Sequence, residues 1–482
     1  MKQKVNSYNL FFVALILIYS NTVLGQKEIR VIESNKLEQI KINDTIFQKF
    51  CGDVMIEYSN LKIKCDTIMI DEHKDYVTGW GSVSFFNDTL NCSSDSIKIY
   101  QELNQIMFYQ NSELNKKKLS INGNKIKYDF EKEIIQYWGK GNVQNNDYNI
   151  SSDELIYYVK DNRFIFSQNI KLLNDNITIN TNNMTNTDSL INFSGPTKIN
   201  YENTVIECQK GHLQHSTNME IFDGLTISSD TTIIKANYLK RNNNKNYFKD
   251  NISIQINNNT YIYGNKLIQE NDISTINSNS YVKLISDSDS TIIFGDTIII
   301  NDKNEYAEIK KNIILHGNEL NGKCEQLTFN SNYTKIKMID DPVLWVKEVQ
   351  VTGDEIDLYC VNNQLDSIYI AKNPFIIAPE DSINCYHQIK GNSLEGNFVQ
   401  NKIDCIKIKG NGVMKYFYDT NKLIGINNVN SGNINLIFNK NNLQEVKCSQ
   451  DIESNYIEVK KEELDTYKRE IIYLNGFNLR KK

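Results

Sequence analysis

A short pattern recurs along most of the chain at a nearly constant spacing. Asp, Asn, Glu or Gly is followed by one further residue and then by Leu, Ile or Met, and eight of the twelve gaps between successive copies are 29 residues. A fixed period of this kind is the signature of repeat proteins, in which neighbouring units bury one another's apolar faces. We therefore predict a stacked array rather than the three separate domains that 482 residues alone would suggest. The copies begin at Asp66, Asp95, Asn124, Asp153, Asn182, Gly211, Asn237, Asn265, Asp296, Glu325, Asp354, Asn392 and Asn421.

Between these positions, apolar and polar residues alternate. Leu61, Ile63 and Cys65 are separated by lysines, a period of two that is typical of a strand with one buried face. A second series of polar residues precedes β-branched residues, as in Gly81-Ser-Val83, and three of the four prolines occupy the same slot. We interpret both series as turns between short strands, about three in each unit. The predicted fold is all-β, an elongated repeat array with a period of about 29 residues.

The N-terminus has the layout of a cleavable export signal. Lys2 and Lys4 precede an apolar run, and small or apolar residues come just before Gln26. We predict a signal peptide over 1–25 and an exported mature chain.

The rest of the chain is expected to contain two stretches of the array and a tail. We predict repeats over 26–235, their continuation over 236–440, and a C-terminal tail over 441–482. The segment Glu458–Arg469 could form a short charged helix, and the basic end Arg480–Lys482 is expected to be solvated.

No pattern of catalytic or metal-binding residues stands out. The net charge of −6 argues against a nucleic-acid binder, which needs a basic face for phosphates. The nine cysteines are an odd number without a CxxC pair, so we interpret them as small core residues rather than a disulfide framework. We predict no metal, no cofactor and no enzymatic activity.

The repeat resembles the OstA-like (organic-solvent-tolerance N-terminal) family. The resemblance lies in Gly52-Asp-Val54 followed by Leu61-Lys-Ile-Lys-Cys65-Asp66-Thr-Ile68, and in Gly141-Asn-Val143 followed by a similar segment that ends at Tyr157. It covers about residues 45–440. The resemblance implies a β-jelly-roll whose two sheets part like a V and hold the acyl chains of lipopolysaccharide between them. The chain departs from the family in its length and in the lack of a long C-terminal run of amphipathic strands.

The alternation gives candidate residues for such a groove, although the sequence does not separate a lipid-lined groove from an ordinary packed core. Inward apolar side chains on successive strands would bury acyl methylenes at roughly 0.8 kcal/mol each. The candidates are Ile63, Ile68, Ile70, Val83, Phe85, Ile97, Ile99, Ile126, Tyr128, Val143, Leu155 and Tyr157.

The predicted function is therefore that of a periplasmic protein that binds and transports lipopolysaccharide towards the outer membrane, with which it could also associate. The expected partners are the lipid A part of lipopolysaccharide and other envelope transport proteins, which would dock by adding strands to the edges of the array. The alternative is a structural or adhesive β-solenoid protein of the cell envelope. A polysaccharide-active β-helix enzyme would need a cluster of acidic and basic residues that the sequence does not provide.

Overall fold

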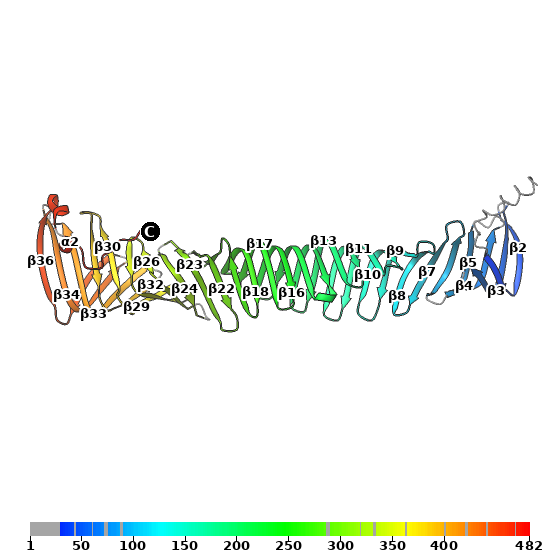
Figure 1. Cartoon of the computed structure of the whole chain (residues 1–482), viewed down its shortest axis with the longest axis horizontal. Helices are drawn as coiled ribbons and strands as arrows, with labels where there is room; N and C mark the ends of the chain where they lie inside the picture. Colours follow the sequence, from blue (N-terminus) through cyan, green and yellow to red (C-terminus); the bar gives the residue numbers. More distant parts are fainter. Residues whose placement is uncertain are drawn as a thin grey trace, which may run out of the picture. The chain divides into compact units, whose positions relative to one another are not determined.

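A computed structural model of the chain confirms the all-β prediction (Figure 1). It describes residues 29–482 apart from 43–44, 60, 72–75, 87–89, 286–289, 319, 331–333, 362–363, 400–401, 420–422, 440–441 and 468. The predicted signal peptide lies outside the described residues. In the described part of the chain there are 36 strands, and no helix there is long and apolar enough to cross a membrane.

The chain forms two compact units, residues 1–216 and 217–482. The predicted boundary between the two stretches of repeats, near residue 235, was inferred from the sequence repeat and stays a prediction. The strands of unit 1 are β1 (Ile29–Glu33), β2 (Lys36–Ile42), β3 (Thr45–Tyr58), β4 (Leu61–Asp71), β5 (Tyr76–Phe86), β6 (Asn91–Tyr100), β7 (Gln105–Lys116), β8 (Leu119–Asp129), β9 (Ile134–Gln144), β10 (Asn149–Tyr158), β11 (Arg163–Asn174), β12 (Ile177–Asn186), β13 (Leu190–Tyr201) and β14 (Thr204–Gln214).

From β3 to β14, each strand of unit 1 pairs antiparallel with the next strand along the chain, and the pairing shifts register in the middle of the strands. Between β4 and β5 the shift skips Gly81 and Ser82, which both have positive φ angles. On the partner strand it skips Cys65 and Asp66. Such β-bulges bend a strand sharply.

The turn interpretation of the two recurring series is therefore wrong for unit 1. Asp66, Asp95, Asn124 and Asp153 lie inside β4, β6, β8 and β10, where the strands bend, and the chain reverses elsewhere. Gly, Asn and Asp favour both reversals and bulges because they tolerate positive φ. As a result the strands are longer and fewer than predicted, with two rather than three for every 29 residues or so.

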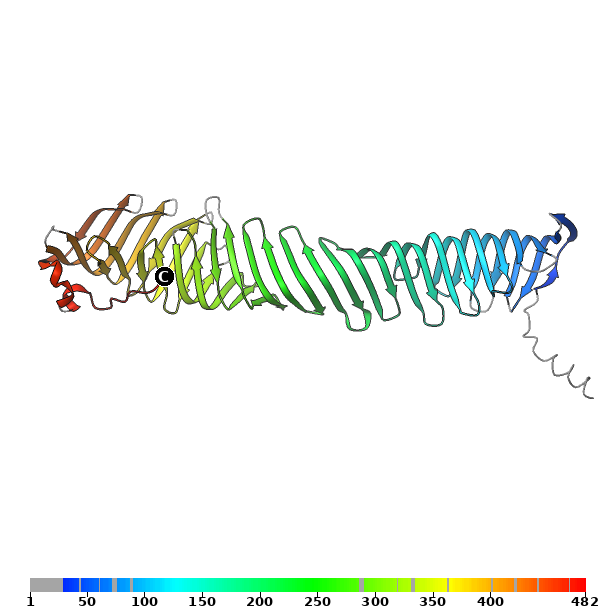
Figure 2. The same ribbon diagram turned by 90° about the horizontal axis from the view of Figure 1, so that it is seen from above.

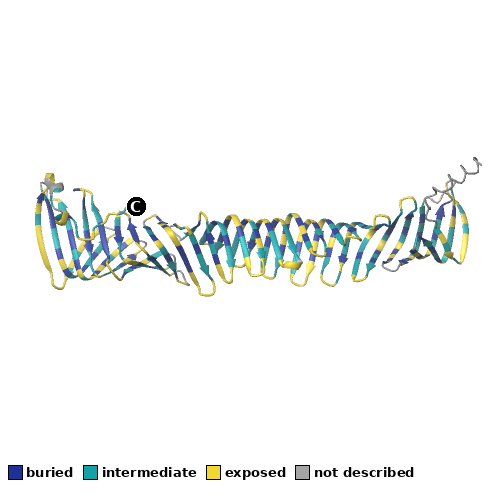
Figure 3. Cartoon of the chain, viewed as in Figure 1, coloured by how far each residue is buried: buried dark blue, intermediate teal, exposed yellow. Residues whose placement is uncertain are grey.

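The line of bulges folds the sheet of unit 1 into two half-sheets. Half-sheet A contains the strand segments on one side of the bulges, such as Leu61–Cys65 and Val83–Phe86. Half-sheet B contains the segments on the other side, such as Thr67–Asp71 and Tyr76–Trp80. The apolar faces of the two half-sheets meet, as Phe85 of A stacks on Phe108 of B with ring centroids 5.5 Å apart. Buried residues alternate with exposed ones along the strands (Figure 3).

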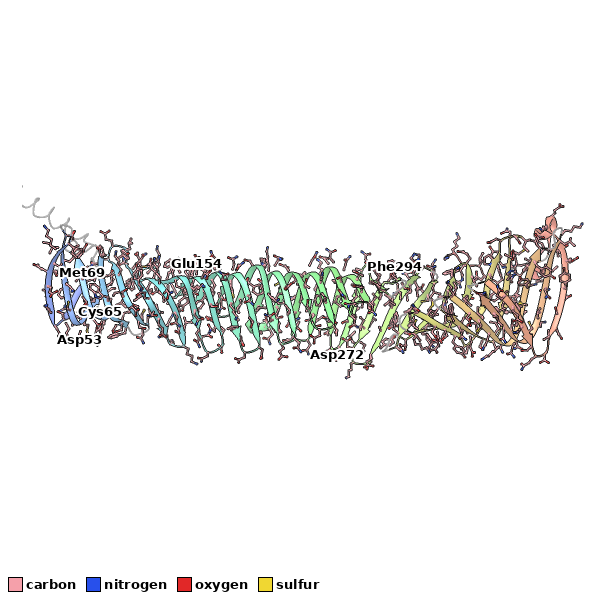
Figure 4. The ribbon with its side chains drawn as sticks, turned by 180° about the vertical axis from the view of Figure 1, so that it is seen from behind. Asp53, Cys65, Met69, Glu154, Asp272 and Phe294 are labelled. Carbon is pink, nitrogen blue, oxygen red and sulfur yellow. The ribbon has the colours of Figure 1, made fainter. Side chains whose placement is uncertain are left out.

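The bulge also changes which residues point inwards. Leu61, Ile63 and Cys65 are buried before the bulge in β4, and Ile68 and Ile70 after it. Figure 4 shows Cys65 within the body of unit 1 and Asp53, a bulge residue of β3, at its edge. Each half-sheet therefore buries every second residue, but the phase differs between the two.

Unit 2 begins with long strands, many strands in its middle part are interrupted where unit 1 has bulges, and two strands of 18 and 17 residues follow near the C-terminus (Figure 2). Its elements are η1 (His215–Thr217, at the boundary), β15 (Met219–Ser228), β16 (Thr232–Asn242), β17 (Lys245–Ile256), β18 (Thr260–Glu270), β19 (Ile273–Asn277), β20 (Tyr281–Ile285), β21 (Ser290–Phe294), β22 (Thr297–Asn301), β23 (Tyr306–His316), β24 (Leu320–Phe329), β25 (Lys335–Ile339), β26 (Val343–Val346), β27 (Val349–Thr352), β28 (Glu355–Val361), β29 (Gln364–Ile370), β30 (Phe375–Glu380), β31 (Cys385–Lys390), β32 (Ser393–Val399), β33 (Lys402–Asp419), β34 (Leu423–Asn439), β35 (Asn442–Ser449), β36 (Glu453–Lys460), η2 (Lys461–Thr466) and α2 (Arg469–Ile472).

The interrupted strands separate the two half-sheets of unit 2. β19 pairs with one end of β18 and β20 with the other end. Each later strand belongs to the half-sheet of the strands it pairs with. Half-sheet B contains β19, β22, β25, β28, β29 and β32. Half-sheet A contains β20, β21, β26, β27, β30 and β31.

The C-terminal segment differs from two expectations. β36 extends to Lys460, so the helical turns η2 and α2 begin later than the predicted helix at Glu458. The basic end is not simply solvated, because Arg480 forms an ion pair with Asp341 and Lys482 forms one with Glu348.

Candidate functional site

The predicted groove residues lie in the interior of unit 1. Eleven of the twelve are buried, and Tyr128 is partly exposed, with its ring edge-on to Phe130. Half-sheet A supplies Ile63, Val83, Phe85 and Val143, and half-sheet B supplies Ile68, Ile70, Ile97, Ile99, Ile126, Tyr128, Leu155 and Tyr157. The structure therefore brings these residues together between the half-sheets. Whether they contact lipid stays a prediction.

One polar contact crosses this apolar interior. The hydroxyl oxygens of Tyr137 in half-sheet B and Ser152 in half-sheet A are 2.6 Å apart. Ser152 donates its own proton to the carbonyl of Glu154, so Tyr137 is the donor to Ser152. Burial raises the pKa of Tyr137 to about 12, and the phenol therefore stays neutral over the physiological range.

Opposite the bulges, side chains join the outer ends of the two half-sheets, and the described residues include polar contacts of this kind. Tyr58 at the end of half-sheet A donates a hydrogen bond to the carbonyl of Gln101 in half-sheet B, at 3.4 Å, and its ring packs edge-on against Phe130. Lys116, at the end of half-sheet A, also reaches half-sheet B, where its ammonium lies 3.5 Å from the carbonyl of Val159. We call this side of unit 1 the mouth. These hydrogen bonds are long, and bonds of such length are weak.

A pocket of about 570 Å³ lies at the mouth. Its lining comes from both half-sheets: Lys116–Leu119, Asn145, Asp147 and Tyr148 from A, and Tyr157, Asn162, Phe164 and Asn186–Asp188 from B. Three consecutive lysines and two acidic residues give it a mixed charge, and aromatic rings form its apolar part. The run Lys116–Lys118 was visible in the sequence, but nothing there placed it opposite Tyr157.

Tyr157 connects the interior with this pocket. Its ring stacks on Phe164 at 4.1 Å, while its hydroxyl donates to Asn162 at 2.9 Å and lies 3.4 Å from the Lys116 ammonium. Burial raises the pKa of Tyr157 to about 12. The residue thus has an apolar ring in the interior and a polar hydroxyl at the mouth. Tyrosine is enriched at such boundaries, where one end of the side chain is in an apolar region and the other contacts water.

In unit 2, the inner face of half-sheet A becomes more exposed near the C-terminal strands. The rings of His387 and Tyr416 stack at 4.2 Å, and Tyr418 stacks on Tyr456 at 5.7 Å. All four share a face with Met414. Tyr416 and Tyr418 follow Met414 at every second residue, and Tyr456 aligns with Tyr416 through Asn427 of β34. His387 lies two residues before Ile389, the partner of Met414. Tyr456 is 45% exposed. The Tyr456 end of this row of rings is therefore accessible, unlike the interior of unit 1.

The described residues contain no group of three or more His, Cys, Asp and Glu side chains that could hold a metal ion. All nine cysteines are free thiols, five of them buried. Burial raises the pKa of Cys65 to about 12 and that of Cys385 to about 11. These thiols are therefore protonated near neutral pH, and thiols react as thiolates.

Comparison with known proteins supports the predicted resemblance. Residues 26–182 match a family model described as OstA-like protein. A solved structure that matches is LptH of Pseudomonas aeruginosa, described as the LptA homologous periplasmic component of the conserved lipopolysaccharide transport device. It is 17% identical, with a TM-score of 0.21, and the match covers 23% of this chain and 82% of LptH. No curated protein matches the chain. Residues 26–182 of the chain are thus similar to OstA-like proteins.

Proposed function

We propose that the chain is a periplasmic lipopolysaccharide-binding and transport protein, not an enzyme, which holds lipid acyl chains between its two half-sheets and passes them towards the outer membrane. The OstA-like match over residues 26–182 supports this class of function. The observation that carries the mechanism is the asymmetry of the interior. The half-sheets are joined by continuous strands at the bulges, but at the mouth of unit 1 side chains such as Tyr58 and Lys116 join them.

This asymmetry supports entry of lipid by parting of the half-sheets. The interior of unit 1 is packed, so an acyl chain must separate side chains such as Phe85 and Phe108 before it can be buried. Parting at the mouth breaks side-chain contacts such as the hydrogen bond of Tyr58 to Gln101 and leaves the backbone pairing of the strands intact. Each acyl methylene then contributes roughly 0.8 kcal/mol on burial, which favours ligands with several long chains.

Edge strands would supply the contacts with partner proteins. In the described part of the chain, β1 and β2 have a neighbouring strand, β3, on one side. β2 carries the exposed apolar residues Leu37 and Ile42, and β35 carries the exposed Leu443. Strand edges with exposed apolar side chains recruit other strands. We propose that other lipopolysaccharide-transport proteins dock on these edges, in the periplasm that the signal peptide over 1–25 would direct the chain to.

Co-purification from native envelopes tests the proposal. The tagged full chain, purified from cells that make lipopolysaccharide, should carry lipid A detectable by mass spectrometry after mild acid hydrolysis, whereas an unrelated exported β-protein purified in parallel should not. Depletion of the chain should reduce lipopolysaccharide at the cell surface. Absence of lipid A together with unchanged export would contradict the proposal and favour a structural or adhesive role.

A further inference from the structure

The last residues of the chain form a strap across the outside of unit 2. After α2 the chain leaves the sheet and returns along half-sheet A, from β33 back to β24, and ends near β26 (Figures 1 and 2). It makes no strand there, and the contacts to the sheet come from side chains. We call residues 469–482 the strap.

The face under the strap is the outer face of half-sheet A. Gln350, Ile377, Gln388 and Lys415 lie opposite one another on successive strands, so their side chains share one face. The opposite face contains Leu344, whose partner Gly322 lies next to Met338 of half-sheet B. The row of Gln350 and its neighbours therefore points away from the interior.

This outer row is nevertheless buried. Gln350 is 1% exposed, Gln388 is 0% and Lys415 is 3%. Polar side chains of these types are rarely buried unless they are hydrogen-bonded, and here the strap supplies the partners.

The two glutamines bind the strap backbone in the same way. Gln350 donates to the carbonyl of Asn478 at 2.9 Å and accepts from the amide of Arg480 at 2.7 Å. Gln388 donates to the carbonyl of Ile472 at 2.9 Å and accepts from the amide of Leu474 at 2.7 Å. Each primary amide thus pairs with a carbonyl and with the amide two residues further on, as a neighbouring strand would.

Lysines and apolar side chains also fix the position of the strap. Lys415 donates to the carbonyl of Ile471 at 2.7 Å, and Lys390 to that of Asn475 at 3.1 Å. Ile472 is buried in an apolar cluster with Phe417 and Ile424 on the outer side of the sheet. The register of the strap is therefore set by both its backbone and its side chains.

Charged groups hold the far end. Arg480 pairs with both carboxylate oxygens of Asp341, and this pair lines a pocket of about 470 Å³ that also includes Trp345. Lys482 donates to the carbonyl of Lys347 at 3.0 Å. The strap is thus held at several separate points along its length.

We infer that the outer face of half-sheet A in unit 2 is a peptide-binding site for a segment with the chemistry of residues 469–482, and that it accepts this segment as a separate peptide. Gln350 and Gln388 bind the peptide backbone, while Lys415 and Asp341 bind its two ends. A segment held by side chains can leave and rebind without unpairing any strand. The site therefore also suits the C-terminal segment of a second copy of the chain, independently of lipid binding.

The experiment uses the full chain with a protease site placed at residue 468, cleaved after folding. The strap peptide should remain with the protein on gel filtration, and a fluorescent peptide 469–482 should exchange into the site with a saturable rise in anisotropy. Peptides with Ile472→Asp or Arg480→Glu should bind at least tenfold more weakly, and these changes leave the protein itself untouched.

Variants of the protein test the glutamines. Gln350→Leu and Gln388→Leu should each weaken peptide binding about tenfold or more, whereas Gln255→Leu, elsewhere in unit 2, should not. Immediate loss of the peptide after cleavage, with an unchanged circular dichroism spectrum, would overturn the proposal. Equal binding of the wild-type peptide and the Ile472→Asp peptide would overturn it as well.

Discussion

Tyr137 and Ser152 join the two half-sheets of unit 1 through a buried hydrogen bond of 2.6 Å. The two residues come from adjacent strands, β9 and β10, but from opposite sides of the bulges. Gly141 makes room for this contact, because a Cβ there would lie 2.7 Å from the Tyr137 ring. This polar contact thus adds to the apolar packing that fixes the interior.

Tyr137→Phe should loosen the interior locally. The substitution removes the hydroxyl but leaves Ser152 bonded to the carbonyl of Glu154, so we expect a loss of about 1 kcal/mol. Hydrogen exchange measured by mass spectrometry should show faster exchange in peptides from β9 and β10. Tyr158→Phe, on the other face of β10, is the matched control and should change little. Equal effects of the two variants would contradict the role of the contact.

The bulges can be tested with two glycines of similar conformation. Gly81 and Gly139 have φ angles of 81° and 78°, a region that costs other residues about 1–2 kcal/mol. A Cβ at Gly139 would meet nothing within 4 Å, but one at Gly81 would lie 2.3 Å from the Asp66 carboxylate.

Gly81→Ala should therefore cost about 1–3 kcal/mol more than Gly139→Ala, because it adds a clash to the backbone strain. Urea unfolding followed by circular dichroism measures both. Asp66→Gly combined with Gly81→Ala should recover part of the difference. Equal losses for the two glycine variants would show that Asp66 does not pack against the bulge in solution.

His387 should make the C-terminal strands sensitive to acid. Burial lowers the pKa of His387, although Glu380 opposes the shift, and its Nδ1 accepts a hydrogen bond from the amide of Phe417 at 3.2 Å. Because the folded state favours the neutral ring, stability is fully present above the ordinary pKa of 6.5 and is lost as the pH falls through the lowered value. The urea midpoint should fall between pH 7.5 and 5.5, and less so in His387→Gln. The same fall in both proteins would contradict this assignment.

Buried thiols should make the folded protein less stable at alkaline pH. The pKa of Cys65 rises from 9.0 to about 12 because burial disfavours the thiolate. Stability from this group is present below pH 9 and is lost as the pH rises towards 12. Cys65→Ser should therefore reduce the loss of stability above pH 9. If the alkaline loss were identical in Cys65→Ser, it would have to come from other groups.

Some features of the fold follow from local sequence, and others do not. Alternation around Val83 and Phe85 predicted correctly that both face the interior, since a strand with one buried face imposes a period of two. Positions such as Asp66 were predicted as turns and lie in bulges, because the same residue types tolerate both conformations. The strap could not be predicted, since Gln350 and Gln388 are ordinary polar residues until the distant Asn478 and Ile472 lie over them.

Two neighbouring phenylalanines allow the most direct test of whether lipid acyl chains bind between the half-sheets. Phe85 is 1% exposed and faces the interior, whereas Phe86 is 40% exposed. A photo-crosslinking phenylalanine analogue should be placed at each position in turn in cells that make lipopolysaccharide. We predict lipopolysaccharide adducts from position 85 and few or none from position 86. Equal adducts from both positions, or none from position 85 in a folded protein, would contradict it.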